Sequence, residues 1–190
     1  MTKRKLISIT GADQGALFPP TTVDTAPAPD LRRVRTFAYG SNVDEAQMRR
    51  RCPSARLLGT ATLRGHAMAF AGHSAGRGGP VATVFACAKL DVPGALYSIT
   101  RDDLARLDAF EGVPWMYERI PAWVVDHDGR RRRAEIYRLQ REHFVLGTPT
   151  PAYLGLIVAA YHRLGIPRAS VSIALTLAAR VKQPRKSKRR

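Results

Sequence analysis

Short β-branched and aromatic segments, separated by turns that contain glycine or proline, constrain the fold of this chain more than any other feature. Such segments predict strands, because these residues pack well on a pleated sheet. The predicted strands cover residues 34–39, 56–62, 66–70, 81–89, 92–98, 117–126 and 131–139. Capping residues and apolar residues at helical spacing predict helices at 44–51, from Thr100 to Gly112, at 152–164 and at about 168–181. Strands and segregated helices are typical of an α+β fold, in which the sheet can curl into a barrel.

The sequence divides into one domain and two terminal segments. Residues 1–33 are rich in proline, threonine and alanine and are predicted to form a flexible N-terminal extension. Residues 34–181 are predicted to form the domain, and residues 182–190 a basic disordered tail with six cations and no anion. The tail carries a large part of the net charge of +16. It is either a solvated end or a non-specific, salt-dependent contact for nucleic acid or another anionic surface.

Several classes of protein are excluded by what the sequence lacks. It contains no zinc-finger spacing, no aromatic-basic RNA-binding signature and no helix-turn-helix, so no specific nucleic-acid partner is expected. No run of about 18 apolar residues is present to span a membrane, and the N-terminal apolar stretch is too short for a signal peptide. Two cysteines and five unclustered histidines predict neither a disulfide framework nor a metal site. We therefore expect a cytoplasmic protein with inert cysteines.

The turn Tyr39-Gly40-Ser41-Asn42 is a candidate anion site, because it joins a predicted strand to a predicted helix. Glycine permits a close backbone approach, and the first N–H groups of a helix lack internal partners. Asn42, three residues before Glu45, is predicted to cap that helix. The alternative is an ordinary strand-to-helix turn. The turn is neither a phosphate-binding loop nor a nucleophile elbow.

Glu111 is the candidate for proton transfer. It ends a predicted helix, where the helix dipole disfavours negative charge, and apolar neighbours such as Phe110 and Trp115 are expected to raise its pKa. The alternative is an exposed helix-terminal glutamate. Tyr117, Tyr137 and Tyr153 stand on different predicted elements, where they can either donate hydrogen bonds to a substrate or fill the core.

The order of these motifs resembles the gamma-glutamylcyclotransferase family over residues 34–167. The match begins at Phe37 and runs through Tyr39-Gly40-Ser41-Asn42. It includes, in order, Pro53-Ser54-Ala55, Gly79 to Phe85, Val92 to Tyr97, Leu107 to Pro114 with Tyr117 beyond, Pro149 to Leu154 and Leu164-Gly165-Ile166-Pro167. Each motif is weak alone, but the whole set in this order is specific.

The resemblance implies a mixed, partly closed β-barrel with flanking helices that binds a γ-glutamyl group. The free α-amine of the substrate then attacks its own γ-carbonyl, which releases an amine or amino acid and leaves 5-oxoproline. No metal or cofactor takes part. The resemblance implies that Glu111 is the general acid and base. It also implies a substrate-binding role for a larger set, namely Tyr39, Gly40, Ser41, Asn42, Tyr117, Tyr137 and Tyr153.

The resemblance does not select the leaving group. The family includes enzymes that act on γ-glutamyl amines, and a non-catalytic binding module on the same fold is a further alternative. The net positive charge of the predicted domain slightly favours the binding of acidic donors such as γ-glutamyl dipeptides or glutathione. The glycine-rich stretch from Ala71 to Gly79 could shape the leaving-group side of the site. The oligomeric state is not predicted.

Overall fold

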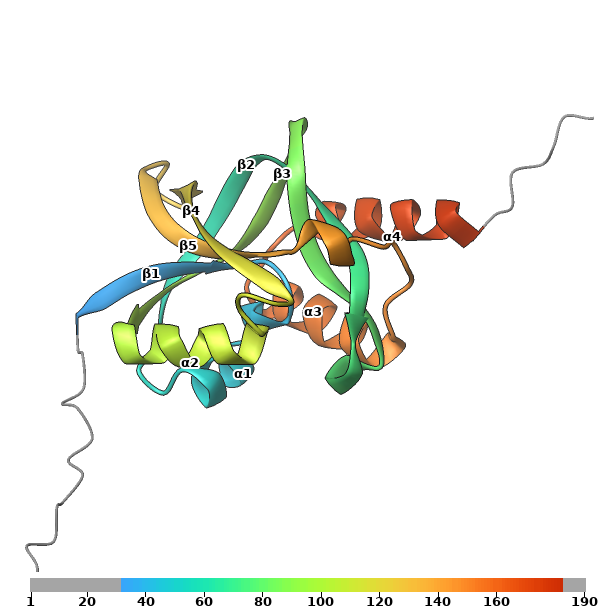
Figure 1. The fold of residues 1–190 in the computed structure, drawn as a ribbon. Helices are drawn as coiled ribbons and strands as arrows, with labels where there is room; N and C mark the ends of the chain where they lie inside the picture. The colour runs from blue at the N-terminus through green and yellow to red at the C-terminus, as the bar shows by residue number, and fades with distance from the viewer. Residues whose placement is uncertain (1–31, 183–190) are drawn as a thin grey trace, which may run out of the picture.

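The computed structural model describes residues 32–182 (Figure 1). The predicted extension at 1–33 and the predicted tail at 182–190 lie outside the described residues, apart from their inner ends. Within the described range, no helix is long and apolar enough to cross a membrane.

Five strands close into a barrel in the order β1-β3-β2-β4-β5 (Figure 1). Their bounds are β1 Arg33–Ala38, β2 Arg56–Ser74, β3 Gly79–Thr100, β4 Tyr117–Asp126 and β5 Arg131–Leu139. Neighbouring strands are antiparallel except for β1 and β5, which pair in parallel at Thr36 and Glu135. The predicted mixed α+β barrel is therefore confirmed, and the barrel is closed.

β2 and β3 are two long strands, whereas the sequence predicted two short strands in place of each. Both strands bend sharply at the same level, where the register shifts between Arg64 and His66 of β2. Gly65 lies at this point with φ +67, a left-handed conformation that favours glycine, and residues 87–90 of β3 stand opposite it. The apparent breaks in the sequence are bends within one hairpin that supplies both sides of the barrel.

Four helices flank the barrel, with α1 and α2 near one another and α3 and α4 farther round (Figure 1). Their bounds are α1 Glu45–Arg51, α2 Arg101–Glu111, α3 Pro151–Arg163 and α4 Ala169–Lys182, and three short 3-10 helices are η1 Ser41–Val43, η2 Ala75–Arg77 and η3 Arg141–His143. As predicted, Thr100 caps α2 and Gly112 ends it in a left-handed conformation. The predicted cap of α1 is wrong, because Asp44 rather than Asn42 accepts a hydrogen bond from Gln47 N.

The core fills the barrel and continues beneath the helices. Its largest fully buried side chains include Phe37, Phe70, Tyr97 and Tyr161. Two of these tyrosines also hold the segment after β1: Tyr97 donates its hydroxyl proton to Val43 O over 3.0 Å, and Tyr161 donates to Tyr39 O over 2.8 Å. Buried hydroxyl groups that find a partner avoid the free-energy cost of desolvation. These two core tyrosines thus hold the backbone of the turn between β1 and α1 in place.

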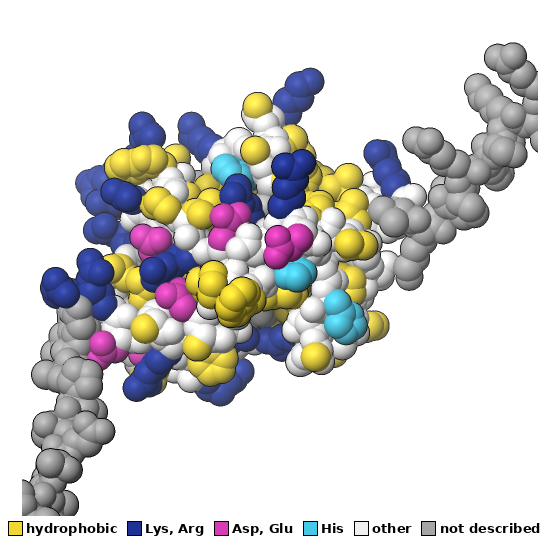
Figure 2. Space-filling view, in the orientation of Figure 1, with side chains coloured by type: hydrophobic (Ala, Val, Ile, Leu, Met, Phe, Trp, Pro, Cys, Tyr) yellow, Lys and Arg dark blue, Asp and Glu magenta, His cyan; other side chains and the backbone are white. Residues whose placement is uncertain are grey.

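Positive charge on the described domain is interspersed with negative charge. Lys and Arg side chains are spread around the face drawn in Figure 2, and Asp and Glu side chains lie among them near its centre. Arg132 pairs with Asp126 over 2.7 Å, and Arg138 pairs with Glu118 over the same distance. The four-arginine run at the start of β5 is therefore partly neutralised by its own hairpin.

Candidate active site

A small cavity of about 50 Å³ lies at the end of β1, between the barrel and α2 and α3. All eight candidate residues line it, namely Tyr39, Gly40, Ser41, Asn42, Glu111, Tyr117, Tyr137 and Tyr153. They come from the β1–α1 turn, the end of α2, β4, β5 and the start of α3. The fold thus gathers into one pocket residues that are more than a hundred positions apart in the sequence.

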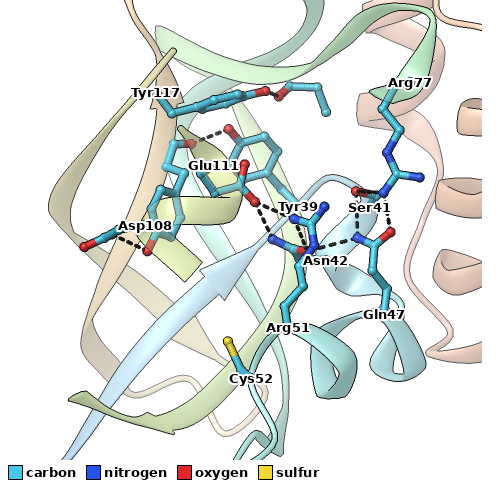
Figure 3. A network of polar contacts seen from close by, with 12 residues as sticks. Tyr39, Ser41, Asn42, Gln47, Arg51, Cys52, Arg77, Asp108, Glu111 and Tyr117 are labelled. Carbon is cyan, nitrogen blue, oxygen red and sulfur yellow. Dashed lines mark hydrogen bonds and ion pairs between the residues drawn. The ribbon is translucent and has the colours of Figure 1, made fainter. Parts of the chain in front are cut away.

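Glu111 is held at one carboxylate oxygen (Figure 3). Asn42 Nδ2 donates a hydrogen bond to Oε1 over 2.8 Å, and Arg51 Nη1 donates to the same atom over 2.8 Å. Arg51 Nη1 also lies 3.0 Å from Asn42 Oδ1, so the three side chains form a triangle. No hydrogen bond to Oε2 is found among residues 32–180, and this second oxygen remains available to a ligand.

Two opposing effects set the proton affinity of Glu111. Burial raises its pKa above 4.5, because the charged form loses its hydration. The charge of Arg51, the hydrogen bonds from Asn42 and Arg51, and the charge of Arg77 all act to lower the pKa. The net result is a raised pKa on a carboxylate that keeps strong partners for its ionised form, which suits a group that accepts and returns a proton.

The expected apolar wall beside Glu111 is only partly present. Trp115 is 80% exposed and lines neither this cavity nor the larger one that adjoins it, whereas Phe110, although 59% exposed, lines the larger cavity with Glu111, as does Met116. In the small cavity Glu111 is surrounded by Tyr39, Tyr117 and other buried residues. The direction of the expected pKa shift agrees with the structure, and buried tyrosines surround the carboxylate in addition to part of the expected apolar wall.

The tyrosines of the pocket are buried and hydrogen-bonded. Tyr117 donates its hydroxyl proton to Ala82 O over 2.8 Å, and Ala82 N donates to the hydroxyl of Tyr153 over 3.2 Å. Tyr39 donates to Tyr137 O. Burial raises the pKa of Tyr39, Tyr117 and Tyr153, which keeps their hydroxyl groups neutral. These residues therefore belong to the core and to the pocket at once.

Tyr137 is a special case among these candidates. Its hydroxyl group donates to Asp108 Oδ1 over 2.8 Å, and Asp108 in turn pairs with Arg119 over 3.2 Å. Tyr137 lines the cavity, but its hydroxyl group already donates its proton to the carboxylate of Asp108. Tyr137 can therefore shape the pocket through its ring, while its hydroxyl group ties β5 to α2.

Gly40 lies close to the opposite wall of the pocket. A Cβ atom at this position would lie 3.0 Å from Ala82 Cβ and 3.5 Å from the hydroxyl of Tyr153. Its amide group and that of Ser41 precede the hydrogen-bonded turn of η1, so they have no partner within that helix. The absence of a side chain at Gly40 lets the backbone approach the pocket, and these amide groups can hold an anion.

A second cavity, of about 310 Å³, adjoins the first. Four residues line both cavities, namely Ser41, Glu111, Tyr117 and Tyr153. We call the smaller cavity the inner cavity and the larger one the outer cavity. The outer cavity is also lined by Arg51, His73, Ser74, Ala75, Arg77, Val81, Ala109, Phe110, Gly112 and Met116. Glu111 thus stands where a small inner pocket meets a larger outer one.

Sequence reasoning missed three polar residues of this site. Arg51 and Gln47 lie on α1, and Arg77 ends η2 within the glycine-rich stretch from Ala71 to Gly79, for which a place on the leaving-group side was one possibility. Gln47 Nε2 donates to Ser41 Oγ over 2.9 Å and to Asn42 Oδ1 over 3.0 Å. The glycine-rich stretch was the one available signal for Arg77, whereas the contacts of Arg51 and Gln47 depend on the fold.

The described residues offer no group of three His, Cys, Asp or Glu side chains that could hold a metal ion. Cys52 lies near the site but does not line either cavity, and burial raises the pKa of its thiol to about 12 (Figure 3). A thiol with a raised pKa is a poor nucleophile at neutral pH.

Comparison with known proteins places this geometry in context. A profile of the family described as "Gamma-glutamyl cyclotransferase, AIG2-like" matches residues 36–152. The chain is 29% identical to the gamma-glutamylcyclotransferase of Homo sapiens over 145 residues, which cover 73% of this chain and 76% of the relative. It is also 29% identical to that of Bos taurus over 137 residues, or 69% and 71% of the two chains. A solved structure titled "Gamma-glutamyl cyclotransferase" has a TM-score of 0.68 at 24% identity, covers 84% of this chain and 93% of its own, and has the same fold.

Proposed function

The chain belongs to the AIG2-like gamma-glutamyl cyclotransferase family and is a cyclotransferase enzyme, and we propose that it converts a γ-glutamyl compound into 5-oxoproline. The observation that carries the proposal is the position of Glu111. Asn42 and Arg51 hold its Oε1 atom by hydrogen bonds, and the residue lines both the inner and the outer cavity. A carboxylate at that junction reaches both nitrogens of the reaction.

In this proposal the α-carboxylate of the γ-glutamyl half occupies the inner cavity, which has a volume of about 50 Å³, and the rest of that half extends past Glu111 towards the outer cavity. The N–H groups of the turn around Gly40 and Ser41 hold its α-carboxylate, since no side-chain volume at Gly40 blocks the approach. A fixed carboxylate folds the short chain back so that its α-amine meets its own γ-carbonyl. Orientation of this kind can supply about 7–11 kcal/mol of a reaction barrier.

Glu111 moves the proton in this scheme. The α-nitrogen bonds to the carbon of the γ-carbonyl group and passes a proton to the carboxylate, which returns it to the leaving nitrogen as the bond between that carbonyl carbon and the leaving nitrogen breaks. Overall, two protons leave the α-ammonium group and two reach the released amine. Glu111 relays the proton that moves while bonds change, and the other exchanges with water. The raised pKa of Glu111 supports both directions of transfer.

The leaving group then occupies the outer cavity, whose volume of about 310 Å³ accommodates an amino acid or amine. Release of either product, including an amine from a γ-glutamylamine, is compatible with a cavity of this size. The use of glutathione as the γ-glutamyl donor stays a prediction. A cytoplasmic location of the protein stays a prediction as well. The fixed carboxylate at the junction favours catalysis over the alternative of a binding module.

A substrate panel tests the proposal. Purified protein is incubated with γ-glutamyl-alanine, γ-glutamyl-ε-lysine and glutathione, and 5-oxoproline and the released amine are quantified together. Equal amounts of both products from at least one compound are expected. If no compound is turned over but 5-oxoproline binds saturably, the chain is a binding module on this fold.

A further inference from the structure

The charges of the two cavities are not balanced. Their lining includes a single acidic side chain, Glu111, and two arginines, Arg51 and Arg77. Arg51 Nη1 lies 2.8 Å from Glu111 Oε1, so these two charges compensate each other. Arg77 forms no ion pair with an acidic side chain among residues 32–180. The outer cavity therefore contains one arginine charge without a counter-ion.

Arg77 is held in place by neutral partners. Its Nη2 atom donates to Gln47 Oε1 and lies 3.5 Å from Ser41 Oγ (Figure 3). Its guanidinium carbon lies 5.3 Å from the ring centre of Tyr153. No hydrogen bond from Nε or Nη1 is found in the described part of the chain. The planar guanidinium group can thus still offer N–H donors to a carboxylate.

We propose that Arg77 is a specificity-determining residue, which selects leaving groups that carry a carboxylate close to the scissile nitrogen. The inference rests on the proposed function. The scissile nitrogen must lie beside Glu111 to receive its proton, and the group attached to that nitrogen extends into the outer cavity, which Arg77 also lines. An amino acid released through its α-nitrogen carries a carboxylate on the adjacent carbon. A simple amine carries none, and a lysine released through its ε-nitrogen carries one much farther away.

The position of Arg77 supports its proposed role in selecting leaving groups that carry a carboxylate. Its charge is close enough to Glu111 to act on that carboxyl group, and both residues line the outer cavity. A carboxylate in the cavity would gain a charge-assisted hydrogen bond, which is about twice as strong as a neutral one. A neutral leaving group of the same size would gain no such interaction.

The test compares two substrates that differ only in this charge, γ-glutamyl-alanine and γ-glutamyl-alaninamide. Wild type is expected to prefer the acid. Arg77→Gln should lose about 10–100-fold more in kcat/KM for γ-glutamyl-alanine than for the amide, mainly through KM. Arg77→Lys should retain part of the preference because it keeps the charge without the planar fork. Arg64→Gln is the matched control. It removes an exposed arginine that lines neither cavity, so kcat/KM should stay unchanged for both substrates.

The outcomes separate this proposal from the one on which it rests. An equal loss for both substrates in Arg77→Gln would overturn it, because the arginine would then act on the γ-glutamyl half or on the fold. Unchanged kinetics for both would overturn it as well. Binding of 5-oxoproline and the melting temperature of each variant show whether the inner cavity is intact. If wild type turns over neither of these two compounds but does turn over γ-glutamyl-ε-lysine, the specificity proposal alone fails. If it turns over no γ-glutamyl compound of either experiment, the proposed function itself fails, and the specificity proposal fails with it.

Discussion

Asn42 Nδ2 donates a hydrogen bond to Glu111 Oε1 over 2.8 Å and so joins two residues that are 69 positions apart in the chain. This contact connects the turn after β1 to the last residue of α2. Arg51 reaches the same oxygen from α1. Three separate segments therefore orient one carboxylate, and Asn42 and Arg51 oppose the rise in its pKa that burial causes.

Replacing Glu111 with Gln should lower kcat/KM by at least about 100-fold for every substrate, because positioned proton transfer contributes about 10²–10⁴-fold. The product assay for 5-oxoproline measures the loss, and circular dichroism checks the fold. Glu142→Gln is the matched control, since the side chain of Glu142 is 75% exposed on η3 and lines neither cavity. Full activity of the Glu111 variant would contradict the assigned role.

Replacing Arg51 with Gln should move the acidic limb of the kcat/KM–pH profile to higher pH. The charge of Arg51 lowers the pKa of Glu111, so its removal raises that pKa and the active carboxylate forms only at higher pH. Arg49→Gln serves as the control, because the side chain of Arg49 lies on the same helix, is 63% exposed and pairs with Glu45. An acidic limb that stays in place in the Arg51 variant would show that another group titrates there.

The stability of the protein should also report the buried carboxyl group. Since burial raises the pKa of Glu111 above 4.5, the folded state binds this proton more tightly than the unfolded state. The resulting stabilisation is fully present below about pH 4.5 and is lost as the pH rises through the raised value. Glu111→Gln lacks this titration. Its free energy of unfolding, relative to wild type, should therefore increase from about pH 4.5 upward in urea denaturation experiments. A constant or decreasing difference would contradict the raised pKa.

Two glycines should respond in opposite ways to substitution by alanine. A Cβ atom on Gly94 would lie 2.1 Å from the backbone oxygen of Ala38, so Gly94→Ala should destabilise the barrel by about 3 kcal/mol or more. Gly155 lies in α3, and a Cβ atom there would have no neighbour within 4 Å. Gly155→Ala should stabilise the protein by about 0.5–1 kcal/mol through helix propensity. Urea denaturation measures both, and similar effects of the two substitutions would refute the packing argument.

The features that the sequence predicted well are local ones. The helix from Thr100 to Gly112 follows from a capping threonine, apolar spacing and a terminal glycine within a dozen residues, and the structure confirms both ends. The strand that leads into Tyr39 and Gly40 is equally local. The fold class followed from these elements, and the resemblance of the ordered motifs allowed the candidate pocket residues to be named together.

The features that the sequence missed depend on contacts between distant segments. Arg51 and Glu111 are 60 positions apart, and no local pattern distinguishes Arg51 from the arginines beside it. The continuous β2 and β3 were likewise missed, because a bend at Gly65 interrupts the hydrophobic pattern in the same way as a loop. A raised pKa of Glu111 was expected from its apolar neighbours, but the exposure of Trp115 and the buried tyrosines around the carboxylate depend on the path of the chain after α2 and on the barrel.

The division of the site into two cavities has a consequence for how such enzymes can diversify. The inner cavity is built from barrel strands and the ends of helices, so its shape is inherited with the fold. Arg77 of the outer cavity instead belongs to the connection between β2 and β3, which can change in length or composition while the barrel keeps its register. If Arg77 selects the released group as proposed, evolution can exchange that group while the cyclisation chemistry stays the same, and laboratory selection can follow the same route.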